Sequence, residues 1–287
     1  MKLYAPSTIK DIKEKYGFRF SKSLGQNFLT DKNVIDKIIE GSGINSQDVV
    51  IEIGPGIGVI TCEAAKIAKK VYAVEIDKNL IPILRDTLGN YNNVEILNQD
   101  ILETDINELT SDAETDNIKI LGNLPYYITT PIIMKLLEEN VKARSITIMM
   151  QKEVADRIKA NPGTKAYGAI SVAVQYYCIV SEITSVPRSA FVPQPSVDSS
   201  VIRLELRDNP PVELDDRDLF FKCVKAGFGQ RRKTLSNSLM TLEGIGKDEI
   251  MESLSECRID PRRRGETLSI VEFAALSNSI YKKKVIK

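Results

Sequence analysis

The stretch that decides the fold is Val49-Val50-Ile51-Glu52-Ile53-Gly54-Pro55-Gly56-Ile57-Gly58, in which an apolar run ends abruptly in three alternate glycines. Such a run predicts a buried strand that passes into a tight glycine turn. Small and apolar residues then recur at helical spacing over residues 60–68, so the turn should open a helix. Glycines at the start of a helix let a ligand approach the backbone, and the stretch therefore predicts a binding site.

A second strand, predicted over residues 70–75, indicates what the ligand is. Its last residue, Glu75, lies where a doubly wound α/β fold hydrogen-bonds ribose hydroxyls, so the ligand should be a nucleoside. Glu52 precedes the glycines, and a carboxylate there would repel a pyrophosphate but suits the ammonium and sulfonium of S-adenosylmethionine. We therefore expect an S-adenosylmethionine site that includes Gly54 and Gly56. A glycine turn that only packs a helix on the sheet would not account for Glu75.

The third predicted strand, residues 94–97, leads to another acidic residue, Asp100. In a right-handed α/β sheet the ends of the first three strands lie side by side, so Asp100 can accept a hydrogen bond from an adenine amino group. Ile76 and Ile101 would sandwich the adenine ring. Asp100 could also cap the short helix that follows, and the two roles are compatible.

The fourth predicted strand, residues 118–122, delivers Asn123-Leu124-Pro125-Tyr126 to the same edge of the sheet. The lone pair of an exocyclic nucleobase amine is delocalised into the ring, so a methyltransferase must orient the amine by holding its N–H bonds with acceptors. Asn123 and the carbonyl of either Leu124 or Pro125 can supply these acceptors, and Tyr126 can stack on the base. The tetrapeptide therefore predicts methyl transfer to a nucleobase amine.

The segment before the first strand contains Gln26, Asn27 and Leu29, just ahead of an amphipathic helical pattern. Polar amides beside apolar residues at such a place can line a pocket. A capped surface turn is the simpler explanation of the spacing alone.

Phe191 opens a proline-rich loop between two late strands, predicted over residues 178–186 and 199–206. Prolines restrict the backbone of the loop, which would hold Phe191 over the pocket. A core phenylalanine in a rigid connection fits the same pattern.

Composition excludes several classes of enzyme. The 287 residues include no histidine and four cysteines, and the cysteines form no C-x-x-C pair. A histidine base, a Ser-His-Asp triad and a histidine-containing zinc site are therefore ruled out, and we expect no metal. The start of the chain has no uninterrupted apolar segment of the secretory kind, which predicts a cytoplasmic protein.

The chain after Asp208-Asn209-Pro210-Pro211 changes to helical periodicity, which predicts a small helical domain. Basic side chains outnumber acidic ones in residues 1–23 and 222–287, whereas the middle of the chain is acidic. The clusters around residues 231–233 and 262–264 suit a phosphate backbone, although solvated surface charge is the alternative.

These motifs together resemble the KsgA/RsmA family of small-subunit ribosomal RNA adenine dimethyltransferases. The resemblance rests on the Gln26–Leu29 segment, the glycine loop, Glu75, Asp100, Asn-Leu-Pro-Tyr and Phe191–Val197, and it covers nearly the whole chain. It implies that S-adenosylmethionine is contacted by residues Asn27, Leu29, Gly54, Glu75, Asp100 and Asn123. It also implies that Tyr126 and Phe191 clasp a flipped adenine, and that two methyl groups go to each of two adjacent adenines near the RNA 3′ end.

The sequence thus predicts a Rossmann-like S-adenosylmethionine-dependent methyltransferase sheet with helices on both faces, over residues 1–208. A helical RNA-binding domain should follow over residues 209–287. Lys22, Arg231, Arg232 and Lys233 are the candidate RNA contacts, and Gln26 joins the cofactor-binding set. We expect a monomer that acts on the 30S ribosomal particle, away from membranes.

Three alternatives remain at this point: a large-subunit methyltransferase of the macrolide-resistance type, a ribosome-assembly factor whose binding outweighs its catalysis, and a nicotinamide oxidoreductase. The long helical tail argues against the first of them. The assembly factor shares every motif with the enzyme, so the sequence does not separate the two. The oxidoreductase would require tight dinucleotide binding.

Overall fold

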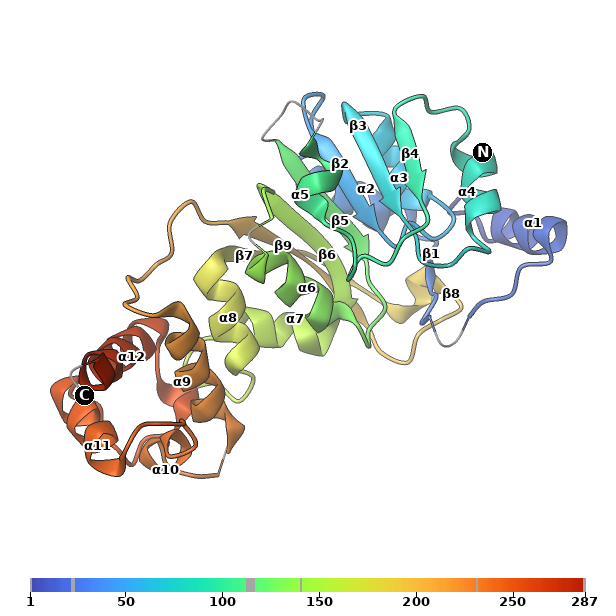
Figure 1. Ribbon diagram of the computed structural model, residues 1–287. Helices are drawn as coiled ribbons and strands as arrows, with labels where there is room; N and C mark the ends of the chain where they lie inside the picture. The colour runs from blue at the N-terminus through green and yellow to red at the C-terminus, as the bar shows by residue number, and fades with distance from the viewer. Residues whose placement is uncertain (1, 22–23, 112–116, 140, 231, 286–287) are drawn as a thin grey trace. The chain divides into compact units, whose positions relative to one another are not determined.

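The computed structural model describes residues 2–21, 24–111, 117–139, 141–230 and 232–285 (Figure 1). The chain divides into two compact units: residues 1–155 with 179–206, and residues 156–178 with 207–287. Each unit has its own hydrophobic core.

A seven-stranded sheet forms the centre of the first unit, in the order β4-β3-β2-β5-β6-β9-β7. The strands are β2 (Val49–Ile53), β3 (Lys70–Val74), β4 (Val94–Leu97), β5 (Ile118–Asn123), β6 (Ser145–Gln151), β7 (Cys178–Val186) and β9 (Ser199–Leu206). Those from β4 to β6 are parallel, and β9 runs antiparallel to β6. β3 and β4 lie on one side of β2, and β5 and β6 lie on the other. Open α/β sheets bind ligands at the carboxyl ends of the strands where the order reverses in this way.

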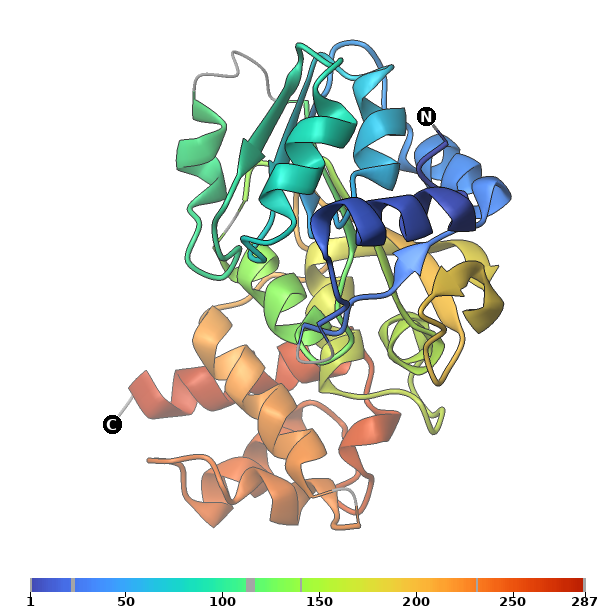
Figure 2. The ribbon, with the colours of Figure 1, turned by 90° about the vertical axis from the view of Figure 1, so that its right-hand side faces the viewer.

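Helices cover both faces of this sheet (Figures 1 and 2). They are α1 (Pro6–Tyr16), α2 (Lys32–Ser42), α3 (Val59–Ala65), α4 (Ile81–Leu88), α5 (Ile106–Leu109) and α6 (Thr129–Glu138), and α7 (Lys152–Lys159) follows β6. Right-handed crossovers in opposite directions place α3 and α4 on one face and α6 on the other. Every residue of β2 is buried, as a strand covered on both faces requires. The predicted Rossmann-like architecture is confirmed.

Within the basic stretch of residues 1–23, for which no helix was predicted, the structure forms α1 (Figure 2, dark blue). Pro6 stands in the first turn of the helix, and Gly17 ends it in the left-handed conformation at φ 60°. Ile9 and Ile12 lie three residues apart on one face and are buried in the core of the first unit. The helix forms because this narrow apolar face docks on the sheet unit.

The second unit is helical. Its elements are α8 (Ala169–Tyr177), α9 (Arg217–Gly229), α10 (Leu235–Leu239), α11 (Lys247–Glu256), the 3-10 turn η3 (Gly265–Thr267) and α12 (Ile270–Val285). The predicted C-terminal helical region is therefore present. No helix within the described residues is long and apolar enough to cross a membrane.

Residues 156–178 group with these C-terminal helices, whereas the predicted division at residue 208 had placed them with the sheet. Tyr167 and Tyr176 explain the grouping, because both belong to the apolar cluster of the helical unit. The ring of Tyr176 lies 5.5 Å from that of Phe220 in α9. The functional division into a catalytic and an RNA-binding domain stays a prediction.

The helical unit depends on a glycine pair. A Cβ atom on Gly265 would lie 2.3 Å from the carbonyl oxygen of Gly227, closer than any side chain tolerates. We expect Gly265→Ala to lower the free energy of unfolding by about 1–3 kcal/mol, because the backbones must separate. Thermal unfolding followed by circular dichroism measures the change. Gly229→Ala is the matched control, since nothing lies within 4 Å of that Cβ position, and an equal loss in both variants would contradict the account.

Candidate active site

A cavity opens at the carboxyl ends of β2, β3 and β5 in the first unit. It is lined by all the residues that the sequence predicted for cofactor binding and catalysis: Gln26, Asn27, Leu29, Gly54, Gly56, Glu75, Ile76, Asp100, Ile101, Asn123, Leu124, Pro125, Tyr126 and Phe191. The register explains this convergence. Ile53 pairs with both Val74 and Gly122, so the residues that follow these three lie side by side at one edge of the sheet. The structure thus brings all the predicted residues to one cavity.

The glycine turn after β2 lies against the N-terminal segment. Gly54 and Gly56 have φ of 68° and 60°, a region that favours glycine. A Cβ on Gly56 would come within 3.1 Å of the ring of Phe28, so a side chain there would also push into the cavity wall. The turn can therefore bring its backbone close to a ligand only with glycine at this place.

Glu75 is almost fully buried at the cavity wall, with 5% of its surface exposed. Its carboxylate accepts hydrogen bonds from the backbone N–H of Asp77, at 2.8 Å, and of Gly56, at 3.3 Å. Burial nevertheless dominates and raises the pKa of Glu75 to about 7. The carboxylate is held in place before any ligand arrives, and a cationic or hydroxyl-bearing ligand would favour its charged form.

Glu52 lies deeper, at 1% exposure, and also lines the cavity. The hydroxyl of Thr61 in α3 donates to it at 2.5 Å. Burial raises the pKa of Glu52 to about 7, and the charge of Glu75 adds to the rise. Two carboxyl groups thus share one largely apolar cavity, and this arrangement favours a positively charged ligand.

Two of the predicted adenine-binding residues, Asp100 and Ile101, follow β4, and the third, Ile76, follows β3. Asp100 accepts a hydrogen bond from the backbone N–H of Leu102 at 2.8 Å inside the turn after β4, whereas the helix that follows, α5, is capped by Asp105. Ile101 is buried, whereas Ile76 is 52% exposed and forms an outer part of the cavity lining. An exposed isoleucine at a cavity is free to cover a ligand.

The amide of Asn123 has its orientation fixed by the N-terminal segment. Its Nδ2 donates to the backbone carbonyl of Asn27 at 3.0 Å. A carbonyl oxygen can only accept, so the amide turns its N–H toward Asn27 and keeps its Oδ1 as an acceptor directed elsewhere. The backbone N–H of Leu124 donates to the carbonyl of Met149 at 3.3 Å, which ties the loop to β6.

The two carbonyls proposed as acceptors differ in their surroundings. The carbonyl of Pro125 accepts from the backbone N–H of Ile128, at 3.1 Å, and from the hydroxyl of Thr129, at 3.0 Å. Its two lone pairs are thus used inside the loop. The carbonyl of Leu124 has no such partner among the described residues.

Phe191 combines both interpretations that the sequence left open. It lies in β8 (Phe191–Val192), which pairs antiparallel with β1 (Phe28–Leu29), and this small ribbon was not predicted. Phe191 is 3% exposed and belongs to the hydrophobic core, yet it also lines the cavity. A core residue and a cavity-wall residue are here the same side chain.

Other residues of the site were missed. Asp77 accepts from the side-chain amide of Gln26 at 2.7 Å, and the backbone N–H of Ser21 donates to that same side chain at 2.7 Å. This clamp folds the N-terminal segment against the end of β3. Gln99 and Phe28 also line the cavity. Asp77 follows Glu75 by two positions, and Phe28 lies within the Gln26–Leu29 segment. Closeness in sequence to the predicted motifs could therefore have identified both residues.

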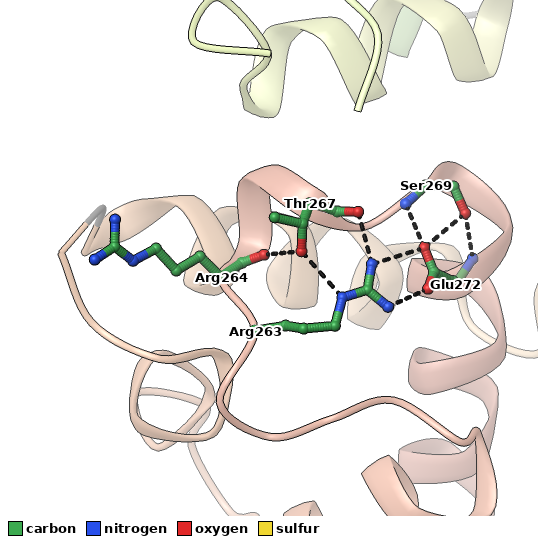
Figure 3. A network of polar contacts seen from close by, with 5 residues as sticks. All are labelled: Arg263, Arg264, Thr267, Ser269 and Glu272. Carbon is green, nitrogen blue, oxygen red and sulfur yellow. Dashed lines mark hydrogen bonds and ion pairs between the residues drawn. The ribbon is translucent and has the colours of Figure 1, made fainter. Parts of the chain in front are cut away.

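Of the predicted RNA contacts, Lys22 and Arg231 lie outside the described residues, and Arg232 and Lys233 are exposed after α9. Two of the three arginines at residues 262–264 form ion pairs with acidic residues of the helical unit. Figure 3 shows Arg263 paired with Glu272 and bonded to Thr267, whereas the side chain of Arg264 points away from this network. Arg262 forms an ion pair with Asp260 at 3.0 Å.

Within the described ranges, no group of three or more histidine, cysteine, aspartate or glutamate side chains is arranged to hold a metal ion. Burial raises the pKa of the Cys178 and Cys223 thiols to about 12, so neither is a nucleophile at neutral pH.

The sheet order, the glycine turn after β2 and the acidic residue after β3 define a Rossmann-like S-adenosylmethionine-dependent methyltransferase. The chain belongs to the ribosomal RNA adenine dimethylase family, whose family model matches residues 17–280. It is therefore an rRNA adenine dimethyltransferase, and its methyl donor is S-adenosyl-L-methionine. The resemblance stated from sequence is confirmed.

Known proteins match over nearly the full chain. Ribosomal RNA small subunit methyltransferase A of Clostridioides difficile (strain 630) is 57% identical over 280 residues, 97% of each chain. The protein of that name from Alkaliphilus oremlandii (strain OhILAs) is 52% identical, over 98% of this chain and 99% of its own. Among solved structures, a dimethyladenosine transferase from Plasmodium falciparum has a TM-score of 0.77 at 26% identity, covering 90% of this chain and 98% of that one. The 23S rRNA methyltransferase ErmE has a TM-score of 0.68 at 25% identity, covering 89% and 100%.

The two buried carboxyl groups predict a pH dependence of stability. Their pKa near 7 in the folded, ligand-free chain exceeds the ordinary value of 4.5, so the folded state binds more protons between these pH values. The contribution of these two groups to the free energy of unfolding is then fully present below about pH 4.5 and is lost as pH rises through 7. Glu52→Gln removes one titrating group and should flatten the decline between pH 5 and 8, by about 1.4 kcal/mol for each unit of pKa shift removed.

Denaturant titrations at several pH values, without S-adenosylmethionine, measure this effect. Glu40→Gln on the exposed side of α2 is the control and should leave the slope unchanged. A Glu52→Gln protein with the slope of the wild type would mean that Glu52 does not carry a raised pKa.

Proposed function

We propose that the protein dimethylates the N6 amino groups of two adjacent adenosines near the 3′ end of 16S ribosomal RNA in the 30S particle, during ribosome biogenesis. One structural observation, in addition to membership of the family, supports methyl transfer at this site: the predicted donor-binding residues and the Asn-Leu-Pro-Tyr loop open onto the same cavity. A methyl donor and an acceptor base bound there would meet without a large movement of the protein.

The donor is assigned to the part of the cavity formed by the ends of β2 to β4. Glu75 would accept from the ribose hydroxyls and Asp100 from the adenine amino group, while Ile76 and Ile101 cover the base. Gly54 and Gly56 would allow close approach of the backbone. Gln26, Asn27 and Leu29 would border the donor from the N-terminal segment.

The acceptor amine is assigned to Asn123 and Leu124. Asn123 keeps Oδ1 available because its Nδ2 is held by Asn27. Between the two carbonyls left open by sequence, that of Leu124 is the better acceptor, since Pro125 already accepts two hydrogen bonds. Two acceptors on the amine would direct its lone pair toward the methyl group, with Tyr126 and Phe191 bordering the base.

The reaction needs no general base before the amine attacks the methyl group. S-adenosylmethionine supplies a methyl group on an activated sulfonium leaving group. The residues of the chain then act by position: they orient the amine, stack on a base flipped at a cost of a few kcal/mol, and exclude water. The amine becomes acidic once it carries the new methyl group and can lose its proton to water or to the carbonyl of Leu124. A chain without histidine is suited to this reaction.

The alternatives differ in their support. ErmE, named for 23S rRNA, shares the fold at 25% identity, whereas relatives at 52–57% identity over nearly full length are named for the small subunit. This favours the small-subunit substrate over the macrolide-resistance type. The rRNA substrate also favours a cytoplasmic location, and we retain the monomer as a proposal.

Methylation of isolated particles tests the substrate. The purified protein with radiolabelled S-adenosylmethionine should modify 30S particles from a strain that lacks the chromosomal gene, and should leave 50S particles unmodified. Mass spectrometry of the 16S RNA 3′ fragment should then find dimethyladenosine at two adjacent positions. A complete dimethyl signal in the deletion strain before any enzyme is added would overturn the assignment.

Removal of the amide of Asn123 tests the mechanism. Asn123→Ala should lower kcat by about 10²-fold or more, because the amine loses an acceptor that orients it. The dissociation constant for the donor, which Asn123 is also expected to contact, should rise by a smaller factor than kcat falls, as measured by calorimetry. Asn33→Ala on the exposed surface of α2 is the control. If Asn123→Ala cells assemble ribosomes normally and cells without the chain do not, binding outweighs catalysis and the assembly-factor alternative holds.

A further inference from the structure

We propose that Ser199 is a positioning residue that fixes the ring of Tyr126 for stacking on the target adenine. The inference rests on the proposed function and adds a residue outside the sequence motifs of the site. The hydroxyl groups of Tyr126 and Ser199 lie 2.8 Å apart and share a hydrogen bond, although the two residues are 73 positions apart in the chain. Tyr126 lines the active-site cavity.

Ser199 is a rigid support. It is fully buried, at 0% exposure, at the start of β9. In the antiparallel register it pairs with Gln151 of β6, inside the seven-stranded sheet. A hydroxyl group on this backbone has a fixed position, so a partner bonded to it is fixed as well.

Tyr126 needs such a support. It lies in the turn between β5 and α6, and its side chain is only partly buried. Rotation about its two side-chain torsions would carry the ring out of the stacking plane, and fixing these torsions in advance removes an entropy cost from the reaction. The hydrogen bond to Ser199 holds the far end of the ring, while the backbone holds the near end.

The preceding residue supports the other aromatic wall. The carboxylate of Asp198 accepts from the backbone N–H of Arg188 at 2.9 Å. Arg188 begins the 3-10 turn η2 (Arg188–Ala190), which leads directly into Phe191. Adjacent residues at the start of β9 thus contact both segments that carry the aromatic side chains. Burial, with the nearby charge of Asp198, raises the pKa of Tyr126, so its phenol stays protonated and able to donate at neutral pH.

Ser200 provides a matched control. It is equally buried and adjacent on the same strand, but its hydroxyl donates to Glu182 at 2.7 Å instead of contacting the catalytic loop. Ser200→Ala removes the same atom from the same strand. A loss of activity that came only from weakening β9 would therefore appear in both serine variants.

The test is a double-mutant cycle on full-length protein, with 30S particles as substrate. Ser199→Ala and Tyr126→Phe should each lower kcat about three- to tenfold. The double variant should have a kcat no lower than that of the less active single variant, because both substitutions remove the same hydrogen bond. Donor affinity should stay within about twofold of the wild type, and Ser200→Ala should keep wild-type kcat. Multiplicative losses in the double variant, or equal losses in the two serine variants, would overturn the proposal.

A second readout does not depend on activity. In protein with ring-labelled ¹³C-tyrosine, Tyr126→Phe identifies the Tyr126 signal by its disappearance. Ser199→Ala should shift and broaden that signal as the ring gains freedom, and Ser200→Ala should leave it in place. An unchanged Tyr126 signal in Ser199→Ala would show that the hydrogen bond from Ser199 does not hold the ring. If the wild type fails to methylate 30S particles, the proposed function falls, and this measurement alone decides whether Ser199 holds Tyr126.

Discussion

The parallel register of β3, β2 and β5 is the constraint on which the site depends. Ile53 pairs with Val74 on one side and with Gly122 on the other; β2 and β3 end at this level, and β5 continues by one residue to Asn123. The next residue of each strand, Gly54, Glu75 and Asn123, must then emerge at one edge of the sheet. A backbone turn, a carboxylate and an amide are thereby brought together by hydrogen bonding between strands, without any direct contact among the three side groups being required.

Polar groups at this edge are held by partners far away in the sequence. The backbone carbonyl of Asn27 orients Asn123, Asp77 binds Gln26, and Ser199 contacts Tyr126. Each of these bonds fixes a side chain that would otherwise be free at the rim of a cavity, and so reduces the ordering that a ligand must impose. The buried carboxyl groups of Glu52 and Glu75 act differently, because burial makes their charge costly until a cationic ligand compensates it.

Local pattern was enough for the framework and for the residues of the cavity. The strand at 94–97 and the buried strand that leads into the glycines at 54–58 were predicted from apolar runs, and the structure has them as β4 and β2. The ribbon of β1 and β8 was missed because two-residue strands have no periodicity to detect. The bond between Tyr126 and Ser199 was missed because a long-range contact leaves no trace in local spacing. Residues 156–178 group with the C-terminal helices for a related reason: packing of side chains such as Tyr167, not chain continuity, decides their unit.

The small ribbon of β1 and β8 also affects how the protein is made. It joins residues near 28 to residues near 191, and the cavity wall contains side chains from both. During synthesis the early strands can associate as they leave the ribosome, but the pocket has no far wall until the chain has grown past β8. The cavity therefore lacks its Phe191 wall until β8 has been synthesised, by which point residues 156–178 of the second unit have already been made.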